Sequence, residues 1–232
     1  MTYSYFDPEE IARTIALLKP NGELYEVRII GVDGRIRSGY FRGASKLIQE
    51  LGRQDLRGAN VYFTLQRLHE GCEARLQWEQ FLESGGRAKI PTTSDNDVTE
   101  YSYIPIDIDP TRPAGISSTD EELEEADNVR AMVEEHMKAH GLRSYISAWS
   151  GNGCHLLYRV PNMAKDEAKA YIEELLNSLD DLYGTDAAHI DGTNYNPARI
   201  FKLYGTRSQK GRNTASRPHR MACIREVVAW DE

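Results

Sequence analysis

Two aspartates separated by one residue are the feature of the sequence that points most directly to chemistry. Asp107 and Asp109 alternate with Ile106 and Ile108. Because successive side chains of a strand face opposite sides, both carboxylates would lie on one face and both isoleucines on the other. Carboxylates this close repel each other unless they are solvated or paired with cations, and hard oxygen ligands suit Mg²⁺ or Mn²⁺. The motif alone leaves a polar strand end open as the alternative.

A glycine-rich turn is the second such feature. Residues 150–155 read Ser-Gly-Asn-Gly-Cys-His. The two glycines permit a tight turn whose backbone N–H groups can face a phosphate. Ser150, Asn152 and His155 would add side-chain hydrogen-bonding groups for the same ligand. In isolation, an ordinary Asn-Gly hairpin followed by a packed histidine explains the segment better.

A third carboxylate is followed by a basic, strand-like run. Asp191 stands in His-Ile-Asp-Gly, and Arg199 and Lys202 come shortly after it. Asp191 could be a third metal ligand or a carboxylate that orients the metal, while Arg199 and Lys202 could neutralise phosphates. The alternative is a loop aspartate beside a solvated basic strand.

The elements that must position these residues follow from the pattern of the second half of the chain. Thr119 with Glu122 forms a capping box that begins a helix. We predict strands over 101–109, 143–149, 155–160 and 199–204, and helices over 119–140 and 164–182. This β-α-β-β-α-β order is the ferredoxin-like pattern of RNA-recognition folds and polymerase palms. A final strand over 221–230 is expected to extend the sheet.

That topology brings the three features to one edge of the sheet. In the usual strand order 4-1-3-2, the end of strand 1 with its two aspartates lies beside the start of strand 3 with His155. The predicted strand 4 is antiparallel to strand 1, so Asp191 and Arg199 would lie at the same end. Carboxylates, a histidine and cations together are what nucleotidyl transfer with two metal ions requires. One ion would lower the pKa of the attacking 3′-hydroxyl, and the other would stabilise the pyrophosphate leaving group.

The first half of the chain is predicted to form an α/β module over residues 1–99, packed on a second module over 100–232 within one catalytic domain. Asp7 and Pro8 begin a helix that ends near residue 18. The remaining expected elements are strands over 23–30, 35–41 and 60–65 and helices over 44–51 and 74–82.

Charge is segregated along the chain. The formal net charge is −8, which by itself argues against a nucleic-acid partner, but no Asp or Glu occurs from Gly192 to Arg225. This basic segment is a candidate phosphate-binding surface. Within it we predict that a template strand contacts Lys210, Arg212, Arg217 and Arg220. A mobile basic loop is the alternative.

Composition narrows the remaining classes. The 40% of hydrophobic and 28% of charged residues are ordinary for a soluble globular protein. No apolar run is long enough to cross a membrane, so no membrane partner is expected.

The cysteines, Cys72, Cys154 and Cys223, are far apart and form no Cys-x-x-Cys pair, so we expect no zinc site and a reducing cytoplasmic setting. His136 and His140, four residues apart on an acidic helix, are interpreted as solvated surface.

In this order and spacing, the motifs resemble those of the archaeo-eukaryotic primase superfamily, especially the primase-polymerases of phages, plasmids and other mobile elements. Its hydrophobic-Asp-x-Asp/Glu motif is matched by residues 106–109, and its small-x-His motif by 153–155. Its hydrophobic-Asp motif, followed by a strand that contains Asn and Arg, is matched by 190–191 and 196–203. Residues 60–65 and 112–122 also resemble members from mobile elements. The resemblance covers roughly residues 24–206.

The resemblance implies an α+β fold in which an N-terminal α/β module packs on an RNA-recognition-like (ferredoxin-like) catalytic module. It implies Asp107, Asp109 and Asp191 as catalytic metal ligands and His155 as a contact to the phosphates of the incoming nucleotide. It implies weaker nucleotide-binding roles for Ser150, Asn152, Arg199 and Lys202. A helicase domain or subunit is a candidate partner, because many relatives carry one.

Our hypothesis from the sequence is a DNA primase-polymerase that makes and extends primers on single-stranded DNA from NTPs or dNTPs, using two Mg²⁺ or Mn²⁺ ions. The rivals are an extension-only repair polymerase of the same superfamily and a non-catalytic single-strand-binding module for replication initiation. Such modules place aromatic residues on their central strands, where this chain has Asp107, Asp109 and His155. A metal-dependent transferase with another nucleotide donor would leave the motifs at His155 and Asp191 unexplained.

Overall fold

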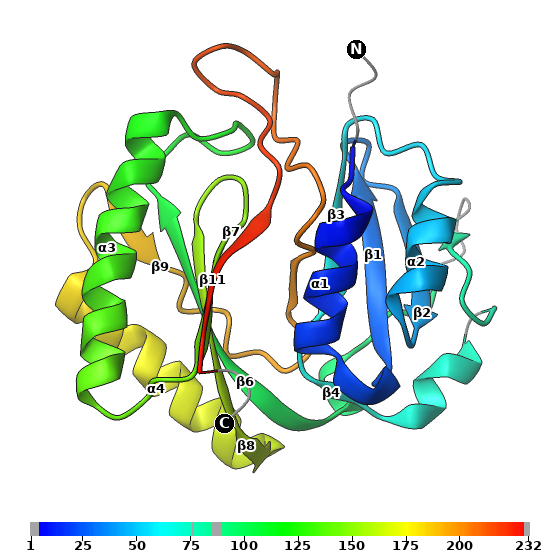
Figure 1. Ribbon diagram of the computed structural model, residues 1–232, viewed down its shortest axis with the longest axis horizontal. Coiled ribbons are helices and arrows are strands. Elements are labelled where there is room, and N and C mark those ends of the chain that lie inside the picture. Colours follow the sequence, from blue (N-terminus) through cyan, green and yellow to red (C-terminus); the bar gives the residue numbers. More distant parts are fainter. Residues whose placement is uncertain (1–4, 76, 85–89, 230–232) are drawn as a thin grey trace.

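Two β-sheets stand side by side in the computed structural model, which describes residues 5–75, 77–84 and 90–229 (Figure 1). The first sheet has the strand order β10-β3-β1-β2-β5. The second has the order β11-β7-β8-β6-β4, with β9 paired to β6 outside this path. In the part of the chain that the structure describes, no helix combines the length and apolar character needed to cross a membrane.

The first sheet is built from the N-terminal half of the chain. Its strands are β1 (Tyr25–Gly31), β2 (Ile36–Phe41), β3 (Ala59–Thr64) and β5 (Leu82–Glu83), and its helices are α1 (Pro8–Leu18) and α2 (Ala44–Leu51). As predicted, Asp7 caps α1, since its carboxylate accepts hydrogen bonds from the backbone N–H groups of Glu9 and Glu10. Short 3₁₀ helices occupy Pro20–Gly22, Glu70–Arg75 and Asp95–Asp97.

The helix predicted over 74–82 is wrong, although residue 76 lies outside the described residues. The chain there leaves the 3₁₀ helix, turns at Glu79 with a positive φ of 51°, and then pairs β5 with β2. A bidentate ion pair between Arg75 and Asp97 fixes the start of this turn. Tertiary pairing has therefore overridden the local helical pattern.

The second sheet is built around the long strand β6 (Val98–Pro110). Its other elements are β4 (Arg67–Leu68), α3 (Asp120–Ala139), β7 (Tyr145–Trp149), β8 (Cys154–Ala164), α4 (Lys165–Tyr183), β9 (Ala188–Ile190) and β11 (Cys223–Val228). β6 lies between β8 and β9, and β7 pairs with β8, so the predicted neighbours of strands 1, 3 and 2 are confirmed, and β9 takes the place of strand 4. The capping box of Thr119 and Glu122 at the start of α3 and the extension of the sheet by β11 are also confirmed.

The predicted fourth strand over 199–204 is wrong. The fourth strand is β9, which pairs with the end of β6, whereas β10 (Ile200–Lys202) joins β3 in the first sheet. Phe201 packs in the same core as Phe63, while Ile190 packs in the core beneath α3 and α4. Each segment therefore pairs with the sheet whose core accepts its apolar side chain. Each sheet therefore contains a strand from the other half of the chain, β10 in the first sheet and β4 in the second.

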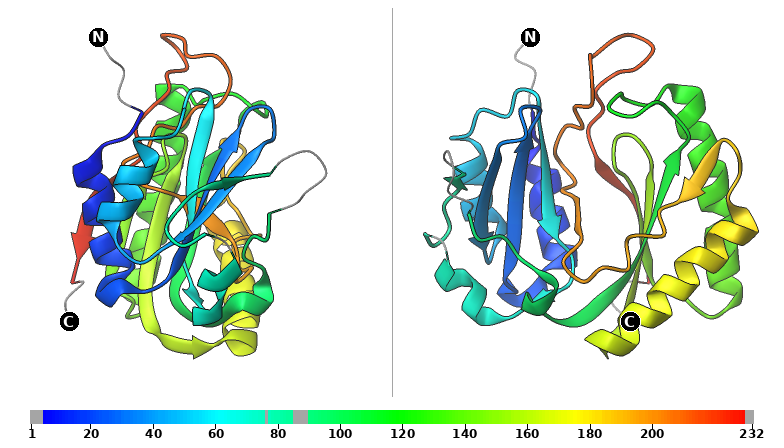
Figure 2. Two further views of the ribbon diagram at one scale, coloured as in Figure 1. Left: turned by 90° about the vertical axis from the view of Figure 1, so that its right-hand side faces the viewer. Right: turned by 180° about the vertical axis from the view of Figure 1, so that it is seen from behind.

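One apolar core joins the two sheets, and α1 packs in it against both. It combines Ile11 of α1 and Val27 of β1 with Ile146 and Leu157 of the second sheet. On the other face of the second sheet, α3 and α4 cover a separate core (Figure 2). The chain after β10 crosses back between the two sheets, as Figure 2 shows, to reach β11.

Candidate active site

A cavity of about 280 Å³ lies where the two sheets face each other. Every residue predicted to bind metal or nucleotide lines it, namely Asp107, Asp109, Asp191, His155, Ser150, Asn152, Arg199 and Lys202. Lys210, predicted as a template contact, lines it as well. The rest of the wall is Tyr62, Asn194, Ile200, Phe201 and Ser208, which the sequence did not single out.

Strand pairing explains how the first two motifs meet. In the β6–β8 ladder, Asp107 stands directly opposite His155, and Ile108 stands opposite Cys154. Ile106 and Ile108 are fully buried, so the two aspartates occupy the other face of β6, as the alternation predicts. The His155 Nε2 atom lies 3.3 Å from Oδ1 of Asp107.

The carboxylate of Asp107 is in an unusual state for a buried group. Its Oδ1 atom is buried and faces Nε2 of His155 at 3.3 Å, but it accepts no hydrogen bond of good geometry from any described residue. Burial opposes its ionisation, but His155, Lys210 and Arg199 outweigh burial and hold the pKa of Asp107 below its ordinary value. A buried charge that lacks well-formed hydrogen bonds is costly, and a bound cation would reduce this cost.

Asp109 and Asp191 each face an arginine. Oδ1 of Asp109 accepts hydrogen bonds from both terminal nitrogens of Arg112, at 3.2 and 3.3 Å. Burial and then the charge of Asp107 raise the pKa of Asp109. Oδ2 of Asp191 lies 2.9 Å from Arg199, and its Oδ1 accepts from the backbone N–H and the hydroxyl of Thr193.

The residues present fit a hard divalent cation of the magnesium type. No group of three or more His, Cys, Asp or Glu side chains within the described ranges is arranged to hold a metal by itself. Mg²⁺ in nucleotide-dependent enzymes usually binds one or two carboxylates and completes its shell with water and substrate phosphates. Asp107 and Asp109 supply such a pair. The role of Asp191 as a third ligand stays a prediction, because Arg199 and Thr193 hold its carboxylate.

His155 is held in place from both ring nitrogens. Its Nδ1 lies 2.8 Å from the hydroxyl oxygen of Tyr204, which leaves Nε2 on the side of Asp107. The imidazole is 2% exposed, and the ring of Phe201 meets it edge-on at 5.6 Å. The sequence did not point to Tyr204, because nothing in the residues around it indicates that it meets a histidine of the other sheet.

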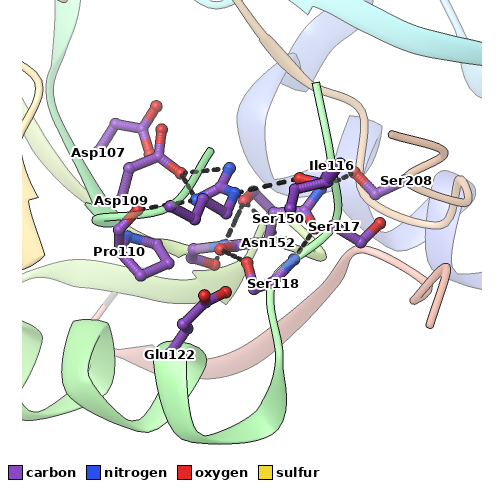
Figure 3. Close-up of polar contacts among 12 residues, drawn as sticks. Asp107, Asp109, Pro110, Ile116, Ser117, Ser118, Glu122, Ser150, Asn152 and Ser208 are labelled. Carbon is purple, nitrogen blue, oxygen red and sulfur yellow. Dashed lines mark hydrogen bonds and ion pairs between the residues drawn. The ribbon is translucent and has the colours of Figure 1, made fainter. Parts of the chain in front are cut away.

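The backbone N–H groups of the glycine turn that could bind a phosphate already make hydrogen bonds within the turn. Backbone N–H groups of Asn152 and Gly153 donate to the hydroxyl of Ser150. The Asn152 side chain is 2% exposed. Its Oδ1 accepts from the Ser118 N–H, and its Nδ2 donates to Ser208, as Figure 3 shows. Asn152 thus ties the turn to two other segments, and its predicted contact with a nucleotide stays a prediction.

Three basic side chains line the cavity and differ in their hydrogen-bond and ion-pair partners. Arg199 is paired with Asp191, and Lys202 donates to the carbonyl of Arg207 at 3.0 Å. Burial and then repulsion from Lys210 lower the pKa of Lys202 to about 7. The ammonium of Lys210 makes no hydrogen bond or ion pair with any residue that the structure describes, and its charge acts on both Asp107 and Asp109.

The other predicted template contacts lie outside this cavity. Both terminal nitrogens of Arg217 contact Glu122 at 2.7 Å, and Arg220 is paired with Asp120. Their segment is thereby fixed to the first turn of α3. Arg212 is exposed, and within the described ranges its side chain makes no hydrogen bond or ion pair. Template binding by Arg212, Arg217 and Arg220 stays a prediction.

Comparison with known proteins places this geometry in a known fold. No protein-family model and no curated protein matches the sequence. The primase-polymerase (AEP) domain of cyanophage S-2L is similar in structure, with a TM-score of 0.55 and 16% identity over 97% of this chain and 92% of that one. Primase RepB′ has a TM-score of 0.52 and 14% identity over 95% of this chain, which spans 56% of its length. The polymerase domain of Mycobacterium tuberculosis Ligase D, solved with DNA, has a TM-score of 0.51 and 11% identity over 92% of this chain and 79% of that one.

The chain therefore has the α+β fold of archaeo-eukaryotic primase-polymerase domains, as its motifs predicted. The three structures include a phage primase-polymerase, a primase and the polymerase domain of a ligase.

Proposed function

We propose that this protein is a DNA primase-polymerase, which joins nucleotides on a single-stranded DNA template. One observation carries the proposal. Beside Asp109, Asp107 presents a buried carboxylate oxygen that faces His155 but accepts no well-formed hydrogen bond from the described residues, in a cavity that Lys210 also lines. A polar strand end would be solvated, and a structural carboxylate would be fully hydrogen-bonded. A site for a cation and a polyphosphate explains both carboxylates and the unpaired lysine.

The residues that line the cavity would have two roles, metal binding and contact with the triphosphate. Asp107 and Asp109 would hold two divalent ions, with Asp191 as the candidate third ligand. When bound, Mg²⁺ or Mn²⁺ supplies a lowered pKa at the primer 3′-hydroxyl and charge stabilisation at the pyrophosphate leaving group. His155 would contact the triphosphate. Lys210, whose ammonium has no partner among the described residues, would offset the triphosphate charge.

DNA as the partner is supported by charge segregation and by likeness of fold. The chain is acidic overall, but residues 192–225 contain no carboxylate. The similar polymerase domain of Ligase D was solved with DNA. We extend this partner to the present chain, with NTPs or dNTPs as the second substrate.

The test is synthesis on unprimed and on primed single-stranded DNA, with labelled nucleotides and Mg²⁺ or Mn²⁺. Products without a primer are expected and would identify a primase. Extension of an annealed primer alone would favour an extension-only polymerase, as the likeness to the Ligase D domain allows. The absence of products in both formats, with intact binding of single strands, would contradict an enzyme and favour the binding module.

Lys210 offers a prediction that separates nucleotide from template binding. Lys210→Ala is expected to raise the KM for the nucleotide by about 10- to 100-fold, because a hydrogen bond to a charged group contributes about 1.5–3 kcal/mol. Arg212→Ala removes an exposed cation from the same segment outside the cavity and is the matched control. If Lys210→Ala weakened template binding with an unchanged nucleotide KM, Lys210 would be the template contact predicted from the sequence.

A further inference from the structure

The loop between β6 and α3 contains a buried arginine, Arg112, to which the sequence assigned no role. The side chain of Arg112 is 8% exposed. Besides Asp109, it donates to two backbone carbonyls, from Nε to Ile116 at 3.3 Å and from a terminal nitrogen to Pro110 at 3.1 Å. A guanidinium with this many fixed acceptors has little freedom to move to another partner.

The loop itself is anchored to the other segments of the site (Figure 3). The backbone N–H and the hydroxyl of Ser118 both bond to Asn152 in the glycine turn. The hydroxyl of Ser117 donates to the Lys210 carbonyl at 3.0 Å. The loop that contains Arg112 is thus connected to the turn before β8 and to the segment that contains Lys210.

The contact of Arg112 with Asp109 is one-sided. Both terminal nitrogens of Arg112 bond to the same oxygen, Oδ1. Oδ2 of Asp109 accepts no hydrogen bond within the part of the chain that the structure describes. Arg-carboxylate pairs are frequently bidentate, with one nitrogen on each oxygen. Here one oxygen is fixed and the other is left without a protein partner.

We propose that Arg112 is a positioning residue, which fixes the Asp109 carboxylate through Oδ1 so that Oδ2 binds the divalent cation. This inference rests on the proposed function, in which Asp109 is a metal ligand. Carboxylates that bind metals are commonly held by outer hydrogen bonds, and loss of such a partner typically lowers metal affinity by about 10- to 100-fold. Arg112 would act through Asp109 and would not contact the nucleotide.

The competing explanation is that Arg112 only closes its own loop through the two carbonyls. A double-mutant cycle separates the two explanations, because a residue that acts through Asp109 has no further effect once that carboxylate is gone. The measured quantity is the affinity of the full chain for Mn²⁺ without nucleotide or DNA, obtained from the electron paramagnetic resonance signal of free Mn²⁺. Thermal melting and circular dichroism of each variant report folding.

Arg112→Ala is expected to weaken Mn²⁺ binding by about 10- to 100-fold in the native background and by less than about two-fold in an Asp109→Asn background. Arg112→Lys, which keeps the charge but not the fork, is expected to lie between the two and serves if the alanine variant does not fold. Arg130→Ala is the matched control, since Arg130 is 13% exposed and paired with carboxylates of α3. It is expected to leave Mn²⁺ affinity unchanged.

Two results would overturn the inference in distinguishable ways. Native Mn²⁺ affinity in a folded Arg112→Ala or Arg112→Lys protein, or an equal loss in both backgrounds, would show that Arg112 does not act through Asp109. Native Mn²⁺ affinity in Asp109→Asn alone would show that Asp109 is not a ligand, and the metal site of the proposed function would fail with it.

Discussion

Replacing Asp107 with asparagine is expected to lower the rate of nucleotide incorporation at least about 100-fold. A bound metal ion contributes several kcal/mol of transition-state stabilisation, and about 1.4 kcal/mol corresponds to a factor of ten. The amide keeps the shape of the side chain but loses the charge that lies beside Asp109 and His155. Because the packing around β6 is unchanged, the protein is expected to stay folded.

The measurement is single-turnover extension of a primed template at saturating Mg²⁺ and nucleotide. Asp181→Asn, an exposed carboxylate in α4, is the control for loss of one negative charge, and full activity is expected from it. Circular dichroism shows whether the Asp107 variant is folded. A folded Asp107→Asn protein with activity within a few-fold of the native rate would remove the metal assignment and, with it, the proposed function.

Local sequence signals predicted most of the fold because they depend on neighbours along the chain. The alternation that places Asp107 and Asp109 on one face of β6 and the capping box at Thr119 each involve only a few consecutive residues. β9 and β10 contain three residues each, which is too short for periodicity to show a face. Their partners are decided by which core accepts Ile190 and Phe201, and this depends on the whole tertiary arrangement.

Some residues of the site could likewise be predicted from local sequence, and others depend on the tertiary arrangement. The carboxylates and His155 were found because their spacing matches the register of adjacent strands. The contact of Tyr204 with His155 depends on how the segment after β10 crosses between the sheets. Arg217 and Arg220 are paired with acidic residues in the first turn of α3. A charge pattern alone does not show which surface charges meet in space.

Gly153→Ala is expected to lower both stability and activity. A Cβ atom at Gly153 would lie 2.5 Å from the Ile108 carbonyl oxygen and 2.9 Å from Oδ1 of Asp109. The first of these contacts is with the backbone of the central strand, which has no flexible end to move aside. Overpacking of this kind costs about 1–3 kcal/mol. A shift of about 1 Å at Asp109 would lower the rate by about 100-fold.

Thermal melting and primer extension measure the two effects. Gly43→Ala is the matched control, because Gly43 has an extended φ of −162° and a Cβ there meets nothing within 4 Å. Near-native melting temperature and activity are expected from it. The same result from Gly153→Ala would mean that the turn and β6 do not approach each other as closely as described.

The kcat and KM of the Gly153→Ala variant also distinguish two explanations of why the turn contains glycine. If the turn mainly supports Asp109, Mn²⁺ affinity and kcat fall while the KM for the nucleotide stays near native. If its backbone binds the triphosphate, the KM rises instead. The N–H groups of Asn152 and Gly153 already donate to Ser150, so we expect the first result. The small residue of the motif would then be required by the close approach of two backbones.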